Sequence, residues 1–323
     1  MLHSDIHSYH DAMFKKVIIA FTAVLLFVGG PLLIKPLTKL KSKGVNSGAW
    51  RASYSERHLP VPPGPREGWW GVRLNPRHDS QLGMVLPERH EPGLFDIDQW
   101  GMQTAVGAPH PRARLLIVGG SVAAGAYASN LGRTYFHQLA HRLSVLTYPV
   151  EITVLAAGAW TSENELQAFR LRGAALKPNY VIFLNGMNDL VLYKQWPEEK
   201  RVQEYLQHMR EARDIALARH IKVIFSPQPF LPDKKKKTGY EVLILAESYP
   251  RVDLLIKAHD QMMAGLRSLE IPGKVYLVDC SGVFDNRKRT VFADIWHFSD
   301  VGHAILAKHL ASDLAPILNL SRS

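Results

Sequence analysis

The sequence predicts a doubly wound α/β fold in which three layers, α/β/α, surround a parallel sheet. From residue 112 to residue 323, short apolar runs alternate with segments of helical periodicity. Five of these runs have the length and composition of buried strands. Strands that alternate with helices in this way pair in parallel, with helices on both faces of the sheet. We therefore expect residues 112–323 to form one domain around a five-stranded parallel sheet.

The expected elements follow one another along the chain, and no internal repeat is visible. The strands are expected at residues 115–118, 150–155, 180–184, 222–225 and 275–279. Helices are expected at residues 134–143, 163–176, 198–219 and 241–269, the last of these broken near Pro250. The helix at 198–219 has an apolar stripe opposite charged residues, which is typical of a helix packed on a sheet. A final helix follows the cap candidates Ser299 and Asp300.

The charge of the chain limits the classes of partner. The 323 residues have an ordinary globular composition and a formal net charge of +10. The basic residues are spread along the chain, and no nucleic-acid-binding motif accompanies them, so we expect no nucleic-acid partner. A membrane surface or an acidic polymer as partner would account for the positive net charge equally well. The four lysines at 234–237 are expected in an exposed loop, with contact to anionic polymer or lipid headgroups as the alternative.

The cysteine and histidine content argues against a metal or redox site. Cys280 is the only cysteine, which excludes an intramolecular disulfide and a cysteine metal cluster. Its place at the end of the strand at 275–279 favours a buried apolar role over a reactive thiol. The histidines lack metal-ligand spacing such as His-Glu-x-x-His. We therefore expect neither a metal nor a cofactor.

The N-terminal part of the chain contains a candidate membrane anchor. Residues 1–16 form a polar tail, and residues 17–34 then run for eighteen positions without a charge. As a helix, this stretch would span the hydrocarbon layer of a bilayer. It is longer than the apolar region of a usual signal peptide, and no small-residue cleavage site follows it, so we expect an uncleaved single-pass anchor. Gly29, Gly30 and Pro31 count against the helix, because they can kink it or end it early.

Residues 35–111 are expected to form a stalk followed by an irregular segment that packs on the domain. The stretch is rich in Pro, Gly, Arg and His, for example at residues 60–65. Trp69, Trp70 and residues 95–102 are too apolar for a free linker. We favour packing on the surface of the domain over a ligand platform for these side chains.

Ser121 lies at the turn around which the sequence is organised. It follows the strand at 115–118 and the pair Gly119 and Gly120, which suits a tight turn. A serine in this place has its hydroxyl at the carboxyl edge of the sheet, and the amides of the following turn can hold an anionic oxygen. The stretch alone leaves two interpretations open, a nucleophile and a serine that only caps the next helix. A phosphate-binding loop is disfavoured, because no lysine follows the glycines.

Further motifs occur at the ends of expected elements. Asn185-Gly186-Met187-Asn188-Asp189 comes directly after the strand at 180–184, and Asp294-Ile295-Trp296-His297 comes just before the last helix. Together with Gly-Gly-Ser and a later glycine block, these motifs, in this order, resemble those of the SGNH/GDSL hydrolase superfamily. The resemblance extends from about Arg114 to the C-terminus. No single block is specific, but the ordered set on a matching pattern of strands and helices is.

The resemblance implies a flavodoxin-like SGNH hydrolase fold and the chemistry of a serine esterase. It assigns the nucleophile to Ser121, the general base to His297 and the carboxylate that orients the imidazole to Asp294. The pKa of an ordinary imidazole is about 6.5, so a histidine can accept and return a proton near pH 7. The oxyanion donors would be the amide of Ser121, the side-chain amide of Asn188 and a backbone amide of the second block. Asp189 is expected to tie down its loop.

The sequence departs from the family pattern at two places. Gly120 stands where many members have aspartate, which leaves the nucleophile unchanged. The second block, at residues 156–162, lacks the asparagine often found before the glycine, and its register can be shifted by one residue. We assign its oxyanion donor to Gly158, with Ala159 as the alternative, because a backbone N–H does not require glycine. His303 is expected to pack or to form a hydrogen bond near the site.

These inferences predict a membrane-anchored esterase that hydrolyses O-acyl groups. We expect acetyl or short-chain esters of a small molecule or carbohydrate as substrates, for example on an envelope polysaccharide. The alternatives are an O-acyltransferase with the same triad and a catalytically silent, tethered binding module. The sequence sets neither the acyl-chain length nor the oligomeric state.

The side of the membrane is a separate question. Four lysines, Lys35, Lys39, Lys41 and Lys43, follow the candidate anchor, and two precede it. By the positive-inside tendency this favours a cytoplasmic catalytic domain. Proteins similar to this one, with an SGNH domain behind an anchor, usually act outside the cytoplasm. We expect the catalytic domain outside the cytoplasm.

Overall fold

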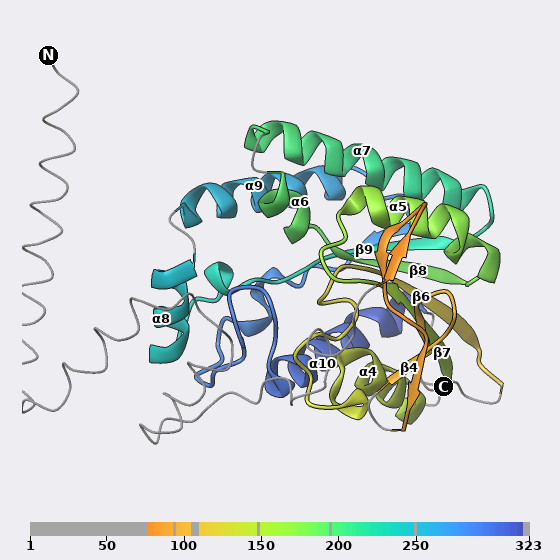
Figure 1. Ribbon diagram of the computed structural model, residues 1–323, viewed down its shortest axis with the longest axis horizontal. Helices are drawn as coiled ribbons and strands as arrows, with labels where there is room; N and C mark the ends of the chain where they lie inside the picture. Colours follow the sequence, from red (N-terminus) through yellow and green to blue (C-terminus); the bar gives the residue numbers. More distant parts are fainter. Residues whose placement is uncertain are drawn as a thin grey trace, which may run out of the picture. The chain divides into compact units, whose positions relative to one another are not determined.

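The centre of the structure is a mostly parallel sheet with helices on both faces (Figure 1). The computed structural model describes residues 77–92, 95–104, 110–146, 149–193, 196–248 and 251–318. Five parallel strands form the core of the sheet in the order β10-β9-β8-β6-β7. They are β6 (Ala113–Gly119), β7 (Val150–Ala156), β8 (Tyr180–Asn185), β9 (Lys222–Pro227) and β10 (Val275–Leu277). This is the flavodoxin-like strand order, whose switch point lies between β6 and β8.

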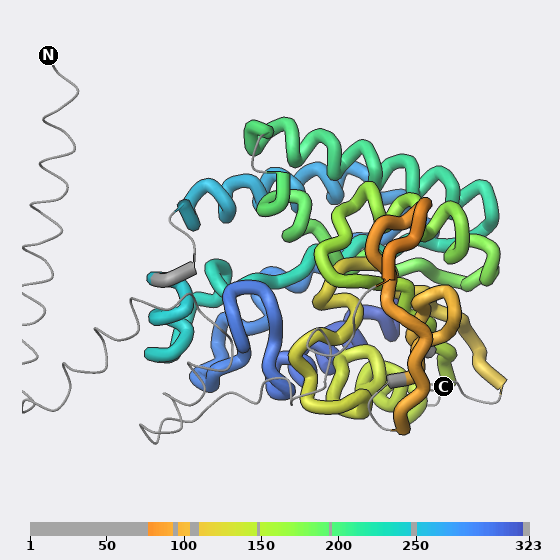
Figure 2. The backbone as a smooth tube through the Cα atoms, viewed as in Figure 1, coloured from red at the N-terminus to blue at the C-terminus, as the bar shows by residue number. Residues whose placement is uncertain are grey.

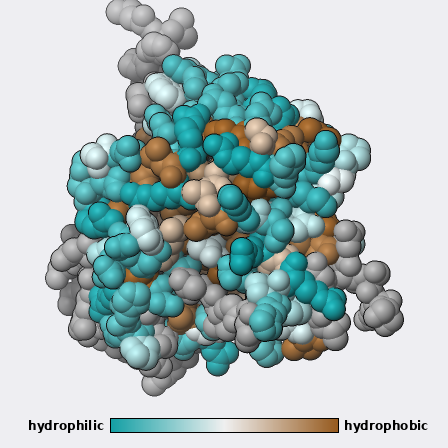
Figure 3. Space-filling model, turned by 90° about the vertical axis from the view of Figure 1, so that its right-hand side faces the viewer, coloured by the Kyte–Doolittle hydropathy of each residue, from teal (hydrophilic) through white to brown (hydrophobic). Residues whose placement is uncertain are grey.

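In the described part of the chain, six helices cover the two faces of this core. On one face lie α5 (Ser162–Leu171), α6 (Met187–Leu192), α7 (Glu198–Leu217) and α9 (Val252–Arg267), and on the other lie α4 (Tyr135–Val145) and α10 (Asp300–Ile317) (Figure 1). Strand β6 serves both faces, because successive side chains of a strand point in opposite directions. Leu116 and Val118 join the cluster with Phe169 of α5, whereas Leu115 and Ile117 join the cluster under α4 and α10. The face of the molecule seen in Figure 3 has many hydrophilic side chains at its surface, with hydrophobic side chains between them.

The observed elements confirm the α/β class and a mostly parallel sheet. The expected helix at 241–269 is two helices, α8 (Gly239–Ser248) and α9, separated near Pro250 as anticipated. Helix α6, directly after β8, is too short to show a helical period and was not expected. The segment after Ser121 forms successive turns instead of a helix. Within it, Gly125 has a φ of 83° and Tyr127 a φ of 69°, which a right-handed helix does not admit.

The sheet is larger than the five strands expected from the sequence. Three short strands, β3 (Arg89–Glu91), β4 (Phe95–Ile97) and β5 (Met102–Thr104), extend it in antiparallel fashion beyond β7. Before them, β1 (Arg77–Asp79) and β2 (Gly83–Val85) form a separate hairpin. The irregular packing expected here is therefore wrong for these residues, drawn in orange in Figure 2. Strands of three residues are too short to show the alternation by which a strand is recognised.

Polar contacts attach this segment to the parallel core. The Arg172 side chain forms an ion pair with Asp79 at 2.5 Å and donates a hydrogen bond to the Trp100 carbonyl at 2.7 Å. The indole N–H of Trp160 donates to the Met84 carbonyl at 2.7 Å. The indole of Trp100 is itself exposed, whereas Met102 is buried. The predicted packing of apolar residues on the domain therefore holds for part of the segment only.

The four lysines at 234–237 do not form a uniformly exposed loop. Lys234 is fully buried, its ammonium group forms an ion pair with the buried Glu241, and it also donates to the Arg289 carbonyl at 2.9 Å. Lys235 and Lys236 are exposed, as expected. The expectation is wrong for Lys234, because a carboxylate from the following helix neutralises its charge inside the protein. Sequence alone does not show which lysine of a run will find such a partner.

Cys280 and the candidate anchor complete the comparison. Cys280 is buried and its Sγ lies 3.3 Å from the Ser226 hydroxyl, and burial raises the pKa of its thiol to about 12. The predicted burial of Cys280 is confirmed. The candidate anchor at 17–34 lies outside the described residues. None of the helices in the described part of the chain combines the length and the apolar content needed to cross a bilayer.

The buried ion pair gives a stability prediction. In Lys234→Ala, the Glu241 carboxylate stays buried with its hydrogen bonds from Thr238 and Val291 but without the opposing charge. We expect the free energy of unfolding, measured by chemical denaturation, to fall by about 3–5 kcal/mol. The matched variant Lys236→Ala removes an exposed lysine and should change it by no more than about 0.5 kcal/mol. Equal effects of the two substitutions would contradict this account.

Candidate active site

Three side chains that are distant in the sequence form a continuous hydrogen-bonded chain. The Ser121 hydroxyl lies 2.8 Å from Nε2 of His297, although 176 positions separate the two residues. On the other side of the ring, Nδ1 of His297 lies 2.7 Å from a carboxylate oxygen of Asp294. With Nδ1 protonated toward Asp294, Nε2 carries the lone pair and can accept the serine proton.

The carboxylate of Asp294 is held in its charged form. Its second oxygen accepts hydrogen bonds from the backbone amides of Trp296 and His297, each at 2.7 Å. Burial by itself would raise the pKa of this carboxyl, but the charge of His297 and these hydrogen bonds outweigh it and hold the pKa below its usual value. Asp294 therefore both fixes the loop and presents a negative charge to the imidazole.

The loop of His297 is held by a hydrogen bond within the loop, by one from the segment after β9 and by the cap of the last helix. The Ala293 amide donates to the His297 carbonyl at 2.8 Å, and the Leu231 amide donates to the Ile295 carbonyl at 3.1 Å. Ser299 caps α10, and its hydroxyl accepts a hydrogen bond from the Gly302 amide, as expected from the sequence. These contacts bring the end of the loop to the carboxyl edge of the sheet, where Ser121 follows β6.

Asn188 lies directly beside the turn of the serine. Its side-chain amide donates to the Trp160 carbonyl at 2.7 Å, which fixes its direction and leaves a second N–H for another acceptor. A Cβ added to Gly120 would lie only 2.7 Å from this amide nitrogen. Glycine at position 120, the departure from the family pattern noted above, is thus what allows Asn188 to approach so closely.

A sequence profile of the GDSL-like Lipase/Acylhydrolase family matches residues 117–305, more than half of the chain. The chain belongs to this family. It is accordingly a hydrolase of ester bonds. The matched residues include the Ser121 turn, the Asn188 loop and the Asp294–His297 pair, so the whole hydrogen-bonded chain lies in the family domain.

Several solved structures are similar to this GDSL-like acylhydrolase. A lipase from a goat rumen metagenome matches with 15% identity and a TM-score of 0.49, over 62% of this chain and 96% of its own. An acetyl xylan esterase matches with 14% identity and a TM-score of 0.48, over 62% and 99% respectively. An acetyl-xylooligosaccharide esterase variant from Geobacillus matches with 16% identity and a TM-score of 0.49, over 68% and 99%. Among curated proteins, none matches the chain.

The second block of the acylhydrolase forms the turn after β7. Gly158 and Ala159 lie in this turn, and Ala159 has a φ of 62°, a backbone conformation in which glycine is more usual. Within the described residues, no protein group accepts a hydrogen bond from the amides of Ser121, Gly158 or Ala159. These N–H groups are therefore open to a ligand. The assignment of the donor to Gly158 stays a prediction.

A buried polar network, which the sequence analysis did not anticipate beyond Asp189, lies next to the Asn188 loop. Asp189 accepts hydrogen bonds from the amide of Ser162 at 3.0 Å and from its hydroxyl at 2.5 Å. Burial raises the pKa of Asp189 to about 7, although these bonds act in the opposite direction. In a second part of the network, the Asn185 amide donates to the buried Glu165 and accepts from the Tyr205 hydroxyl. Asp189 thus ties the Asn188 loop to the start of α5, as expected.

Two rings complete the surroundings of His297. The ring of Tyr127 stacks on the His297 imidazole with centroids 4.8 Å apart and an interplanar angle of 14°. His303 is fully buried and its Nε2 lies 3.0 Å from the Ala126 carbonyl, which fits the predicted packing role. Burial lowers the pKa of His303 to about 4, so this ring stays neutral. The sequence analysis did not identify Tyr127. Nothing in a turn of small residues indicates that an aromatic side chain there contacts a histidine as distant in the sequence as His297.

The contact between Gly120 and Asn188 gives a test of the site. In Gly120→Ala, the added methyl group must displace the Asn188 amide. Losing one oxyanion donor costs on the order of a hundredfold in kcat, and we expect a loss of that size against an aryl acetate, with a normal circular dichroism spectrum. Gly239→Ala is the matched control, because a Cβ there meets nothing within 4 Å. Full activity of Gly120→Ala would show that Asn188 is not needed in its present position.

Proposed function

We propose that this acylhydrolase is a serine esterase in which Ser121 is the nucleophile, His297 the general base and Asp294 the carboxylate that orients the imidazole. The observation that carries the proposal is the pair of distances on either side of the ring, 2.8 Å from Ser121 to Nε2 and 2.7 Å from Asp294 to Nδ1. A nucleophile within reach of a base that a third group orients is the arrangement that covalent ester hydrolysis requires.

In the acylation step, the Ser121 oxygen attacks the ester carbonyl carbon and its proton passes to Nε2 of His297. The carbonyl oxygen becomes an oxyanion that accepts hydrogen bonds from the Ser121 amide, the second N–H of Asn188 and the amide of Gly158. Collapse of this intermediate breaks the bond to the alcohol oxygen. The alcohol leaves with the proton returned by His297, and the acyl group stays on Ser121.

In the deacylation step, water takes the place of Ser121 as the nucleophile and the Ser121 oxygen becomes the leaving group. Water attacks the acyl carbon while His297 accepts one of its protons. The tetrahedral intermediate then expels the Ser121 oxygen, which regains the proton from Nε2, and the carboxylic acid departs. Throughout, the Asp294 carboxylate stabilises the positive charge that forms on the imidazole, and its lowered pKa keeps it ionised.

The substrate class we propose is an acetyl or short-chain O-acyl ester on a carbohydrate, such as an envelope polysaccharide. The net charge of +10 supports a partner with acidic groups. We further propose that residues 17–34 anchor the chain in a membrane with the catalytic domain outside the cytoplasm. A reporter enzyme that is active only outside the cytoplasm, fused after the anchor, should then be active. An inactive reporter would place the domain on the cytoplasmic side.

The catalytic roles are tested with the full-length chain and p-nitrophenyl acetate. Ser121→Ala removes the nucleophile and His297→Ala the base, so each should lower kcat by at least about a thousandfold, because removal of a triad member leaves only the oxyanion hole and binding. Labelling of the protein by a fluorophosphonate should be lost in Ser121→Ala as well.

The control for this test is His141→Ala, which removes an exposed histidine of α4 that is not part of the triad. It should keep the activity of the wild type. Equal turnover by the wild type and Ser121→Ala would reject the assignment. Absence of labelling in the wild type would instead favour a silent binding module.

A further inference from the structure

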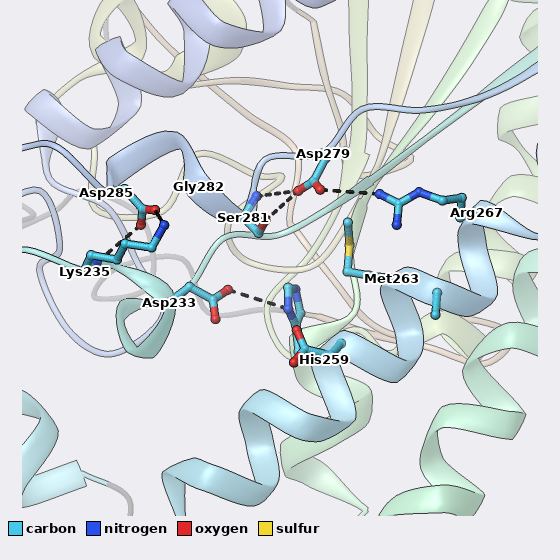
Figure 4. A pocket seen from close by; sticks show the side chains of 11 residues that line it. Asp233, Lys235, His259, Met263, Arg267, Asp279, Ser281, Gly282 and Asp285 are labelled. Carbon is cyan, nitrogen blue, oxygen red and sulfur yellow. Dashed lines mark hydrogen bonds and ion pairs between the residues drawn. The ribbon is translucent and has the colours of Figure 1, made fainter.

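An acidic pocket of about 400 Å³ lies at the carboxyl ends of β9 and β10, outside the triad (Figure 4). Its walls come from the segment after β9, from α9 and from the segment after β10. The volume is within the range of pockets that bind small molecules. The polar residues that line it are Asp233, Lys235, His259, Asp260, Arg267, Asp279, Ser281 and Asp285.

The charges of this pocket do not cancel. The Lys235 ammonium pairs with Asp285 at 2.6 Å, and the Arg267 guanidinium pairs with Asp279 at 3.7 Å. The carboxylates of Asp233 and Asp260 remain. In the described part of the chain, Asp260 has no hydrogen bond and no ion pair with a cation that lines the pocket. Burial and the nearby carboxylates of Asp260 and Asp285 raise the pKa of Asp233 to about 7. The Lys237 ammonium group acts in the opposite direction but donates its hydrogen bonds to the carbonyls of Pro232 and Lys234. The pocket therefore has an excess of negative charge in a protein that is basic as a whole.

His259 is buried and Asp233 is partly buried, and each has a buried atom with unused hydrogen-bonding capacity. The two side chains face each other, with Asp233 Oδ2 3.6 Å from His259 Nδ1 (Figure 4). His259 is 2% exposed, and neither its Nε2 nor Oδ2 of Asp233 has a hydrogen-bond partner among the described residues. Burial lowers the pKa of His259 to about 4, so the ring is neutral and does not compensate Asp233. A buried polar group without a hydrogen-bond partner lowers the stability of the fold. Where such a group lines a cavity, it indicates a ligand that supplies the missing hydrogen bond.

The composition of the pocket limits its ligand. An anion is disfavoured by the carboxylates. Among the described residues, no group of three or more His, Cys, Asp or Glu is arranged to hold a metal ion. An organic cation remains, and a protonated primary amine combines a positive charge with three hydrogen-bond donors in a compact group.

We propose that this pocket binds the primary ammonium group of a small organic molecule, with Asp233 and Asp260 as its anionic partners. The ligand supplies the positive charge and the N–H donors that the pocket lacks. Two sources share this chemistry, an amino sugar and an aliphatic polyamine, and the experiment below separates them. The inference goes beyond the proposed esterase reaction and does not depend on it.

The pocket is physically connected to the loop of the triad. The ring of Phe230 lies 5.0 Å from the His259 ring and 6.4 Å from the Trp296 ring, between centroids. The amide of Leu231 donates to the Ile295 carbonyl at 3.1 Å. A ligand in the pocket is thus separated from the His297 loop by one layer of side chains.

Calorimetric titration of the full-length chain with glucosamine and with 1,4-diaminobutane tests the proposal. Glucose and N-acetylglucosamine, which lack an ammonium group, are the ligand controls. We expect at least one of the two amines to bind, and Asp260→Asn to weaken its binding by about threefold, because the substitution removes a negative charge from an exposed residue, where ion pairs are weak, without disturbing the fold. Asp233→Asn should weaken it at least as much.

The protein controls separate this pocket from the triad. Asp253→Asn removes an exposed carboxylate of the same helix outside the pocket and should leave the affinity unchanged. Ser121→Ala should also bind normally, so that failure of the esterase assignment and failure of this one are distinguishable. Binding of glucosamine alone identifies an amino sugar, and binding of the diamine alone a polyamine. No binding of either amine, or equal binding of glucose and glucosamine, overturns the proposal.

Discussion

The parallel pairing of β6 with β7 on one side and β8 on the other is the constraint on which the site depends. In this register Gly119 lies opposite Ala156 and Leu184, so three strands end at the same level. Their hydrogen bonds are evenly spaced along the strands and allow no local adjustment without a shift of the whole ladder. The Ser121 turn, the second block and the Asn188 loop therefore start from one edge, and only the His297 loop has to be brought there by separate contacts.

Close approach at this edge explains why the first block has glycine before its serine. Asn188 is locked by the Trp160 carbonyl, and its nitrogen lies where a side chain at position 120 would begin. In the sequence the glycine was simply a departure from the common aspartate. The structure makes it a spatial requirement of this particular arrangement, because the amide and a Cβ cannot occupy the same volume.

The sequence indicated most of the α/β domain because its signals are local. Apolar runs at β6 and β8 and the amphipathic period of α7 each lie within one element, and the ordered motifs point to Ser121, Asn188, Asp294 and His297, which the structure brings to one edge. What it did not indicate depends on contacts between distant segments. The stacking of Tyr127 on His297, the hydrogen bond from buried Lys234 to the Arg289 carbonyl, and the charge excess around Asp233 and Asp260 are of this kind. Strands β3 to β5 were missed for another reason, since three residues carry too little pattern.

The antiparallel pairing of β5 with β7 also has a consequence for how the protein is handled. Without β5, the outer side of β7 would be a free edge of unpaired N–H and C=O groups next to a buried apolar core. Such an edge is a template on which a second chain can add a strand. A recombinant fragment cut at the start of β6, where the family pattern begins, would carry that exposed edge, and one that begins ahead of β1 would keep it covered.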